Sequence, residues 1–239
     1  MKDYTLAIED GIVTSIELEN AEAAESGMEV LPSPREMTGR LWIPREVTGF
    51  APEVLIGCAP EAIEVEAGNP AFRAQGNCLL SRDGSTLVLA CKNSVLPEDG
   101  SLVRIGDGAF NWALDLSELA LDPLRLPASV RVIGRRGLAL YSENAVHLLA
   151  PASVERVEVM ALMMRSDDPR GCTVTFAGSP LLVPGVFGTR AEAADTEDES
   201  YAGLPPILFT HPDSLLVQAP AGSSVLAYCA RYGLPAEAI

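Results

Sequence analysis

A short sequence pattern recurs along this chain at nearly constant spacing, and it constrains the fold more than any other feature. The pattern is an aliphatic residue, often a glycine next, two spacers, a small residue and a large apolar residue. Its copies begin at Phe50, Ile105, Ile133, Val157 and Leu182. The intervals are 55, 28, 24 and 25 residues, so the first is close to two periods and one further turn is expected inside it. Such a period indicates stacked structural repeats, each contacting only its neighbours.

A second pattern, an aliphatic residue followed by proline, a short spacer and valine, precedes most copies of the first. It occurs at Ile43–Val47, Leu126–Val130 and Ala150–Val154. Short alternating apolar runs, such as Ile63–Val65 and Val174–Phe176, have the period of two that indicates strands. Proline ends a strand because it has no N–H to donate to a ladder. We therefore expect one short strand per repeat, stacked about 4.8 Å apart into a parallel sheet.

One stretch in the first half of the chain carries the most specific match to a known family. It contains Gly68–Phe72, Gly76–Leu80, Thr86–Ser94 and Ile105–Phe110. This order resembles the inserted hairpin and standard repeat of the BspA-like leucine-rich repeats of bacterial surface and secreted proteins. The resemblance covers residues 40–190 and the C-terminus, and the period fits the range of about 20–29 residues for leucine-rich repeats.

The expected fold is a leucine-rich-repeat solenoid, a right-handed superhelix of short parallel strands with irregular or short helical convex turns. Residues 40–239 form the repeat domain in this interpretation, and residues 1–39, which match no repeat, form an N-terminal cap or an irregular β segment. One core should bury the following apolar residues of the repeats: Ile105, Phe110, Ile133, Leu138, Val157 and Phe187.

Two local structures are expected within the repeat domain. Asp83-Gly84 lies between apolar runs near residues 77–91, which predicts an antiparallel hairpin with its tip at Arg82–Ser85. Residues 223–232 are similar to the closing helix of the BspA-like family. Ser223 or Ser224 can cap its start and Gly233 its end. One face of the helix is formed by Val225, Cys229 and Tyr232.

An acidic, alanine-rich insertion over residues 191–200 interrupts the repeats. Its acidic residues are Glu192, Asp195, Glu197, Asp198 and Glu199. Such a composition favours a mobile, solvated loop. A calcium site is the alternative, although the segment lacks the D-x-D-x-D-G order of a calcium-binding loop.

The charge balance argues against binding to nucleic acid or to an anionic membrane. The chain has 17 basic and 33 acidic residues, a net charge of −16. Its nearest approach to a basic cluster is Arg131, Arg135 and Arg136, which we interpret as a solvated edge. No apolar run reaches the ~18 residues of a membrane span. The N-terminus as written has no secretory signal, whereas the family resemblance suggests a surface or secreted protein.

No catalytic or metal-binding signature occurs in the sequence. The five cysteines are an odd number without C-x-x-C spacing, which argues against zinc and against a disulfide framework, and we expect them to be reduced. The nucleophile elbow, the phosphate-binding loop and the H-E-x-x-H motif are absent. His147 and His211, the two histidines, are far apart. No cofactor, metal or catalytic residue is therefore predicted.

The sequence and the resemblance together favour a non-catalytic, monomeric binding scaffold. Its partner would be a protein or a glycan, bound on the solvent side of the strands. The candidate surface residues are Glu64, Glu118, His147, Leu149, Thr173, Thr175 and Gln218. Two alternatives stay open: an enzyme on an unrecognised fold, and a purely structural repeat domain.

Overall fold

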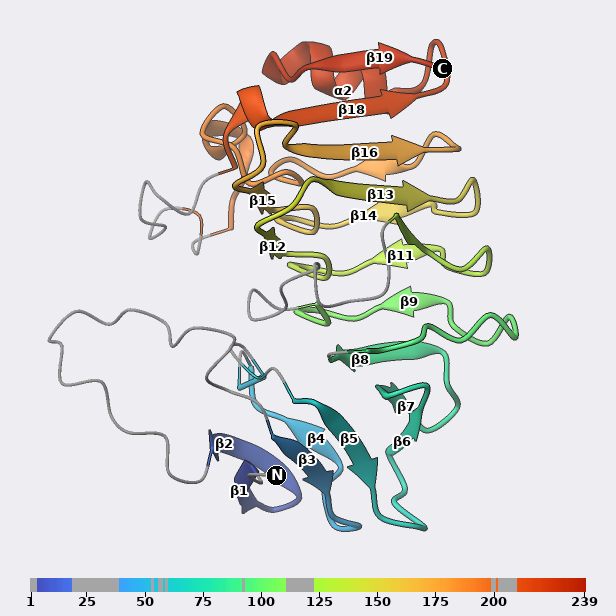
Figure 1. Cartoon of the computed structure of the whole chain (residues 1–239), viewed down its shortest axis with the longest axis vertical. Coiled ribbons are helices and arrows are strands. Elements are labelled where there is room, and N and C mark those ends of the chain that lie inside the picture. The colour runs from blue at the N-terminus through green and yellow to red at the C-terminus, as the bar shows by residue number, and fades with distance from the viewer. Residues whose placement is uncertain are drawn as a thin grey trace, which may run out of the picture.

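The computed structural model describes most of the chain, with several gaps. The described residues are 4–18, 39–52, 54–55, 58, 60–91, 93–110, 123–198, 201 and 210–239. Within them the strands are stacked along the long axis of the molecule, as Figure 1 shows, with the N-terminus at one end and the C-terminus at the other.

A five-stranded parallel sheet forms one side of the stack (Figure 1). Its strands, in order, are β10 (Leu124–Arg125), β13 (Val146–Ala150), β16 (Cys172–Phe176), β18 (Leu215–Ala219) and β19 (Ala236–Ala238). Alternate residues of the longer strands point inward and are buried, as in Val146, Leu148 and Ala150 of β13. The branched and apolar side chains of successive strands therefore form a continuous ladder inside the stack.

A seven-stranded sheet forms a second side. Its order is β17 (Leu181–Leu182), β14 (Arg156–Val157), β11 (Val132–Ile133), β9 (Arg104–Ile105), β8 (Thr86–Ala90), β7 (Cys78–Ser81) and β6 (Phe72–Gln75). A third, two-stranded parallel sheet consists of β12 (Leu140–Ser142), which follows β11 in the chain, and β15 (Met164–Ser166), which follows β14. Each repeat thus supplies strands to two sheets, and the expectation of one strand per repeat was wrong. The additional strands are only two or three residues long, too short to show alternation in the sequence.

The recurring pattern sets the register of the seven-stranded sheet. Ile105 pairs with Ile133, Ile133 with Val157, and Val157 with Leu182. All six residues expected to share one core are fully buried in the same cluster. Stacked parallel strands in register around one apolar interior confirm the leucine-rich-repeat solenoid.

The copy at Phe50 does not belong to this ladder. Phe50 lies in β4 (Gly49–Phe50), which pairs with the N-terminal strand β2 (Ile12–Leu18). The residue opposite Ile105 on the other side is Leu87 of β8. The further turn expected inside the 55-residue interval is therefore the β7–β8 hairpin. The repeat period does not predict its antiparallel pairing.

The predicted hairpin is present. Strands β7 and β8 are antiparallel, and Gly84 has a φ of 81°, the conformation that glycine adopts at least cost. The Asp83 carboxylate accepts hydrogen bonds from the Ser81 hydroxyl at 2.7 Å and from the Ser85 N–H at 3.0 Å. These bonds lower the pKa of Asp83 to about 2.

The hairpin also separates two cores. Cys78, Leu80 and Leu87 belong to the main core of the solenoid. Leu79 and Leu89, on the opposite face of the same strands, belong to a second core on the N-terminal side. The six repeat residues all lie in the main core, so the solenoid interior is continuous from β8 to the C-terminal helix α2 (Ser224–Tyr232).

The second core is closed by N-terminal strands. β1 (Tyr4–Glu9) and β2 (Ile12–Leu18) form an antiparallel hairpin, and β3 (Arg40–Ile43) pairs in parallel with β5 (Ala62–Val65). Tyr4 and Val13 of this hairpin are buried together with Leu41 and Ile43 of β3.

The C-terminal helix forms as predicted. Helix α2 covers Ser224–Tyr232, and the Ser223 hydroxyl accepts a hydrogen bond from the Leu226 N–H at 3.3 Å. Gly233 ends the helix in the left-handed conformation, with a φ of 66°. The predicted apolar face is buried: Val225, Cys229 and Tyr232. Among the described residues, no helix is long and apolar enough to cross a membrane.

Candidate functional site

The outer face of the five-stranded sheet presents two rows of side chains that cross the strands. The first, here called the His147 row, consists of His147, Thr173 and Leu216. The second, the Thr175 row, consists of Arg125, Leu149, Thr175, Gln218 and Glu237. Because the strands are parallel and in register, neighbouring side chains of a row stand about 4.8 Å apart.

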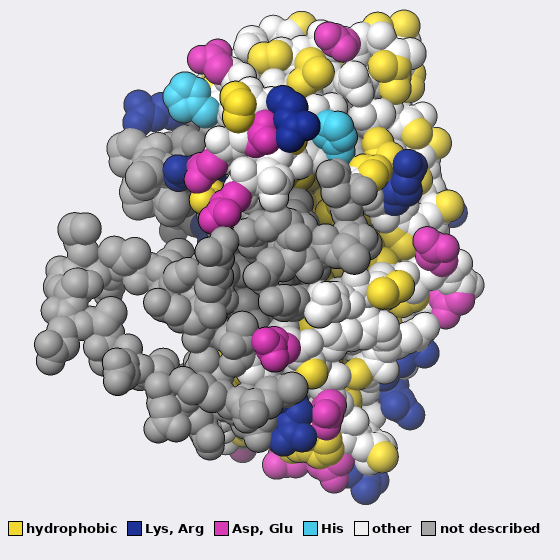
Figure 2. Space-filling model, in the orientation of Figure 1, with side chains coloured by type: hydrophobic (Ala, Val, Ile, Leu, Met, Phe, Trp, Pro, Cys, Tyr) yellow, Lys and Arg dark blue, Asp and Glu magenta, His cyan; other side chains and the backbone are white. Residues whose placement is uncertain are grey.

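Hydrogen bonds link part of the Thr175 row. The Thr175 hydroxyl donates to the Gln218 side-chain oxygen at 2.9 Å, and the Gln218 amide donates to the Glu237 carboxylate at 3.4 Å. Arg125 and Glu237, at the two ends of the row, are exposed. The row therefore has a guanidinium at one end, a carboxylate at the other and neutral side chains between them. In Figure 2, the upper part of the molecule mixes hydrophobic, charged and histidine side chains without a broad patch of one kind.

Five of the seven predicted surface residues lie in these two rows. His147 is exposed, and the others are partly buried on the outer face: Leu149, Thr173, Thr175 and Gln218. Glu64 is exposed too, but it lies in β5, in a separate two-stranded sheet, and forms an ion pair with Arg40 at 3.8 Å. Glu118 lies outside the described residues. Arg125 and Glu237 belong to the rows but were missed.

The five cysteines and His211 lie in contrasting environments in the described structure. All five cysteines are buried, and none of them forms a disulfide bond. Burial raises the pKa of Cys78 and Cys229 to about 11 and of Cys58, Cys91 and Cys172 to about 12. These groups therefore remain thiols, which are poor nucleophiles, at neutral pH. The His211 imidazole is exposed beside Asp213, at 3.9 Å.

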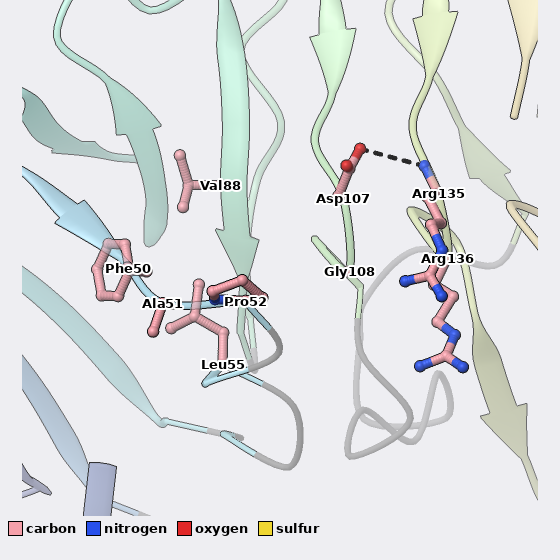
Figure 3. Close-up of a pocket in the computed structure, with 9 residues that line it drawn as sticks. All are labelled: Phe50, Ala51, Pro52, Leu55, Val88, Asp107, Gly108, Arg135 and Arg136. Atoms are coloured by element: carbon pink, nitrogen blue, oxygen red, sulfur yellow. Dashed lines mark hydrogen bonds between the residues drawn. The ribbon is translucent and has the colours of Figure 1, made fainter. Parts of the chain in front are cut away.

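A cavity of about 450 Å³ opens beside the turns of the seven-stranded sheet. Apolar residues line one side of it and charged residues the other, as Figure 3 shows. The apolar lining is Phe50, Ala51, Pro52, Leu55 and Val88. The remaining lining is Asp107, Gly108, Arg135 and Arg136. Pockets of about 300–1,000 Å³ are typical of small-molecule sites.

This cavity corrects the interpretation of the arginine cluster as a solvated edge. Arg131 does lie exposed and forms an ion pair with Glu155. Arg135 and Arg136 are instead half-buried and line the cavity. Their place in the cavity depends on Phe50, Ala51, Pro52 and Leu55, which line its other side and are far away in sequence. The arginine cluster alone does not indicate this arrangement.

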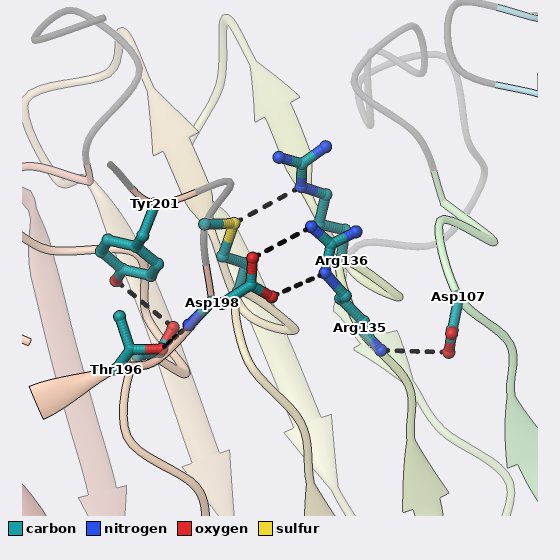
Figure 4. Close-up of polar contacts among 8 residues, drawn as sticks. Asp107, Arg135, Arg136, Thr196, Asp198 and Tyr201 are labelled. Carbon is teal, nitrogen blue, oxygen red and sulfur yellow. Dashed lines mark hydrogen bonds and ion pairs between the residues drawn. The ribbon is translucent and has the colours of Figure 1, made fainter. Parts of the chain in front are cut away.

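The acidic insertion packs onto the same turns. The Asp198 carboxylate accepts hydrogen bonds from the Arg135 guanidinium at 2.9 and 3.4 Å, and the Arg135 N–H donates to Asp107 at 3.2 Å (Figure 4). Asp195 accepts hydrogen bonds from Arg231, at 2.6 Å, and from the Tyr232 hydroxyl, at 2.9 Å. These contacts tie the insertion to the solenoid at two points.

Glu192 is the residue of the insertion for which the prediction of a solvated loop was wrong. Its side chain is fully buried. Its carboxylate accepts hydrogen bonds from the Phe187 N–H at 3.1 Å, the Thr189 N–H at 2.8 Å, the Thr189 hydroxyl at 2.9 Å and the Tyr228 hydroxyl. Burial, with Glu192 nearby, raises the pKa values of Tyr201 and Tyr228 far above their usual range. The described residues contain no group of three or more metal-ligating side chains close enough to hold an ion.

Comparisons with known proteins add two solved structures. No protein-family model and no curated protein matches the sequence. The crystal structure of the pneumococcal vaccine antigen PcpA aligns with a TM-score of 0.47 and 13% identity, over 85% of this chain and 57% of that chain. A leucine-rich repeat protein from Eubacterium ventriosum aligns with a TM-score of 0.30 and 16% identity, over 62% of this chain and 57% of that chain. The chain thus spans little more than half the length of either protein.

Proposed function

We propose that this protein is a non-catalytic binding scaffold of the BspA-like leucine-rich-repeat type. It recognises another protein through the His147 and Thr175 rows. The observation that carries this proposal is the register of the five-stranded sheet, which aligns outward side chains from five strands on one rigid face. A rigid, extended surface suits macromolecular recognition because little conformational entropy is lost when it binds.

The composition of the rows favours a protein over a glycan as the partner. The rows mix hydrogen-bonding side chains with partly buried Leu149 and Leu216. Interfaces between proteins combine apolar and hydrogen-bonding groups in this way. Neither row contains phenylalanine, tyrosine or tryptophan. A glycan would therefore find no flat aromatic ring on which to stack a sugar.

We propose further that residues 1–39 serve as the N-terminal cap of a repeat domain spanning residues 40–239. The burial of Tyr4 and Val13 against Leu41 and Ile43 supports this division. Helix α2 serves as the opposite cap, because its apolar face contacts β17, β18 and β19. Covered ends limit pairing between chains at open sheet edges.

The proposal is tested by capturing a partner from a lysate of the source organism and measuring its affinity for matched variants. Thr175→Glu adds a charge at the centre of the Thr175 row. Leu181→Glu adds the same charge at an outward position of β17, where the leucine is 57% exposed on the other sheet. We expect Thr175→Glu to weaken binding at least about tenfold, because an unpaired charge is costly in an interface. Leu181→Glu should leave the affinity unchanged.

Two outcomes would contradict the proposal. Equal affinities for Thr175→Glu and Leu181→Glu would show that the partner does not bind the rows. Turnover of any substrate that is lost in His147→Ala would identify an enzyme instead.

A further inference from the structure

The cavity beside Arg135 and Arg136 is built from parts of the chain that are far apart in sequence. Phe50 is the last residue of β4, and the other apolar lining residues near it follow that strand. Val88 lies in β8, and the two arginines follow β11. The apolar wall is held in place, since the Phe50 ring packs on the Phe72 ring with centroids 5.2 Å apart. A site of this kind is assembled only by folding, and no part of it belongs to the His147 or Thr175 row.

The polarity of the cavity is divided between its two sides. Figure 3 shows Phe50, Leu55 and Val88 on one side and the guanidinium groups of Arg135 and Arg136 on the other. Among the described residues, the charged lining consists of the guanidinium groups of Arg135 and Arg136 and the carboxylate of Asp107, and Arg135 is also paired with Asp198. A ligand that fits both sides has an apolar body and an anionic end.

Existing contacts hold the charged side in position. Asp107 accepts a hydrogen bond from the Arg104 guanidinium at 2.7 Å, and Asp198 accepts two from Arg135. The Arg136 Nε donates to the Met160 sulfur at 3.4 Å, which orients the guanidinium (Figure 4). A guanidinium carries five N–H donors in a planar fork that matches a carboxylate.

The backbone at Arg136 has a conformation that favours glycine. Arg136 has a φ of 51°, a left-handed conformation that is unfavourable for residues with a side chain. Gly108 and Gly185 occupy the same position of the recurring pattern in other repeats, with φ values of 65° and 92°. Met160, the fourth residue at this position, has a φ of 54°, and its side chain packs in a small cluster with Ala139, Met163 and Tyr201. The turn of each repeat therefore sets this backbone conformation, and glycine would fit it at position 136.

We propose that this cavity binds a small monocarboxylate with an apolar body. The carboxylate accepts hydrogen bonds from Arg136, with Arg135 beside it, and the apolar body packs against Phe50, Leu55 and Val88. This site is independent of the proposed recognition of a protein partner, since the two share no residue.

Titration calorimetry with decanoate and with the neutral decanamide tests the proposal. We expect decanoate to bind at least about tenfold more tightly than decanamide, because charge-assisted hydrogen bonds add to the shared apolar contacts. Arg136→Gly should abolish this preference. Glycine suits the left-handed backbone, so this variant should melt at the same temperature as the wild type or higher. Arg156→Gln, a loss of the same charge at an exposed position of β14, should change neither affinity.

A second variant tests the contribution of the apolar side of the cavity to binding. Val88→Gln should weaken decanoate and decanamide alike, because it places an amide in the apolar wall. The proposal is overturned if decanoate does not bind at millimolar concentration, if decanamide binds as tightly, or if Arg136→Gly and Arg156→Gln behave alike.

Discussion

Glu192 anchors the acidic insertion to the solenoid through the hydrogen bonds of its buried carboxylate. A buried carboxylate is tolerated only when its oxygens are satisfied by hydrogen bonds. Here two backbone N–H groups and two hydroxyls supply them, one of the hydroxyls from Tyr228 of helix α2. The carboxylate therefore joins the turn after β17, the insertion and the C-terminal cap.

We predict that Glu192→Gln destabilises the protein by about 2–5 kcal/mol, since the amide nitrogen would face donors and leave them without an acceptor. Glu197→Gln is the matched control, because Glu197 is exposed in the same segment. It should shift stability by no more than about 0.5 kcal/mol. Urea denaturation followed by circular dichroism measures both variants. Equal midpoints for the two would refute the structural role of Glu192.

The buried thiols predict how stability depends on alkaline pH. Their folded-state pKa values, about 11 to 12, lie above the ordinary value of 9.0. The unfolded chain therefore loses thiol protons first as pH rises above 9. The stabilisation is complete below pH 9 and is lost as pH rises toward 11 to 12.

Each thiol should contribute a slope of up to about 1.4 kcal/mol per pH unit in this window. Cys172→Ala removes one of them, so its free energy of unfolding should fall less steeply than that of the wild type above pH 9. Urea denaturation at several pH values compares the two slopes. Parallel curves would show that Cys172 ionises as readily in the folded state as in the unfolded chain.

At the scale of elements, the sequence was sufficient where a pattern repeats over several residues. Ile105, Ile133 and Val157 occupy equivalent positions because a branched aliphatic residue and a tight turn recur together. The hairpin tip and the caps of α2 were predictable for the same reason, since turn and cap positions select particular residues. Two-residue strands such as β11 and β14 carry no alternation and emerge only from the register of their neighbours.

The candidate site was predictable to the same extent. Thr173 and Thr175 alternate within a five-residue strand, so their outward direction follows from the sequence. Arg125 and Glu237 lie in strands of two and three residues and were missed. The cavity could not be predicted, because it brings Phe50 and Leu55 opposite turns that lie more than fifty residues later in the chain. Whether the rows bind a partner stays a prediction.

At the scale of the whole molecule, the described ends of the stack are protected. The short outermost strand β19 carries the exposed Glu237 near the C-terminus, and short or charged edge strands resist pairing with another chain. Strands β1 and β2 lie at the opposite end (Figure 1). A net charge of −16 adds electrostatic repulsion between copies.

We therefore expect the full chain to be a monomer at neutral pH. Size-exclusion chromatography with light scattering should give the mass of one chain at micromolar concentration. Removal of residues 1–39 takes Tyr4 and Val13 away from Leu41 and Ile43, which are fully buried in the intact protein. Exposed apolar side chains on strands promote association, so the truncated chain should form larger species at the same concentration. A truncated chain that stays folded and monomeric would show that these residues do not act as a cap. A dimer of the full chain would show that the ends, or the outer rows, already serve contacts between copies.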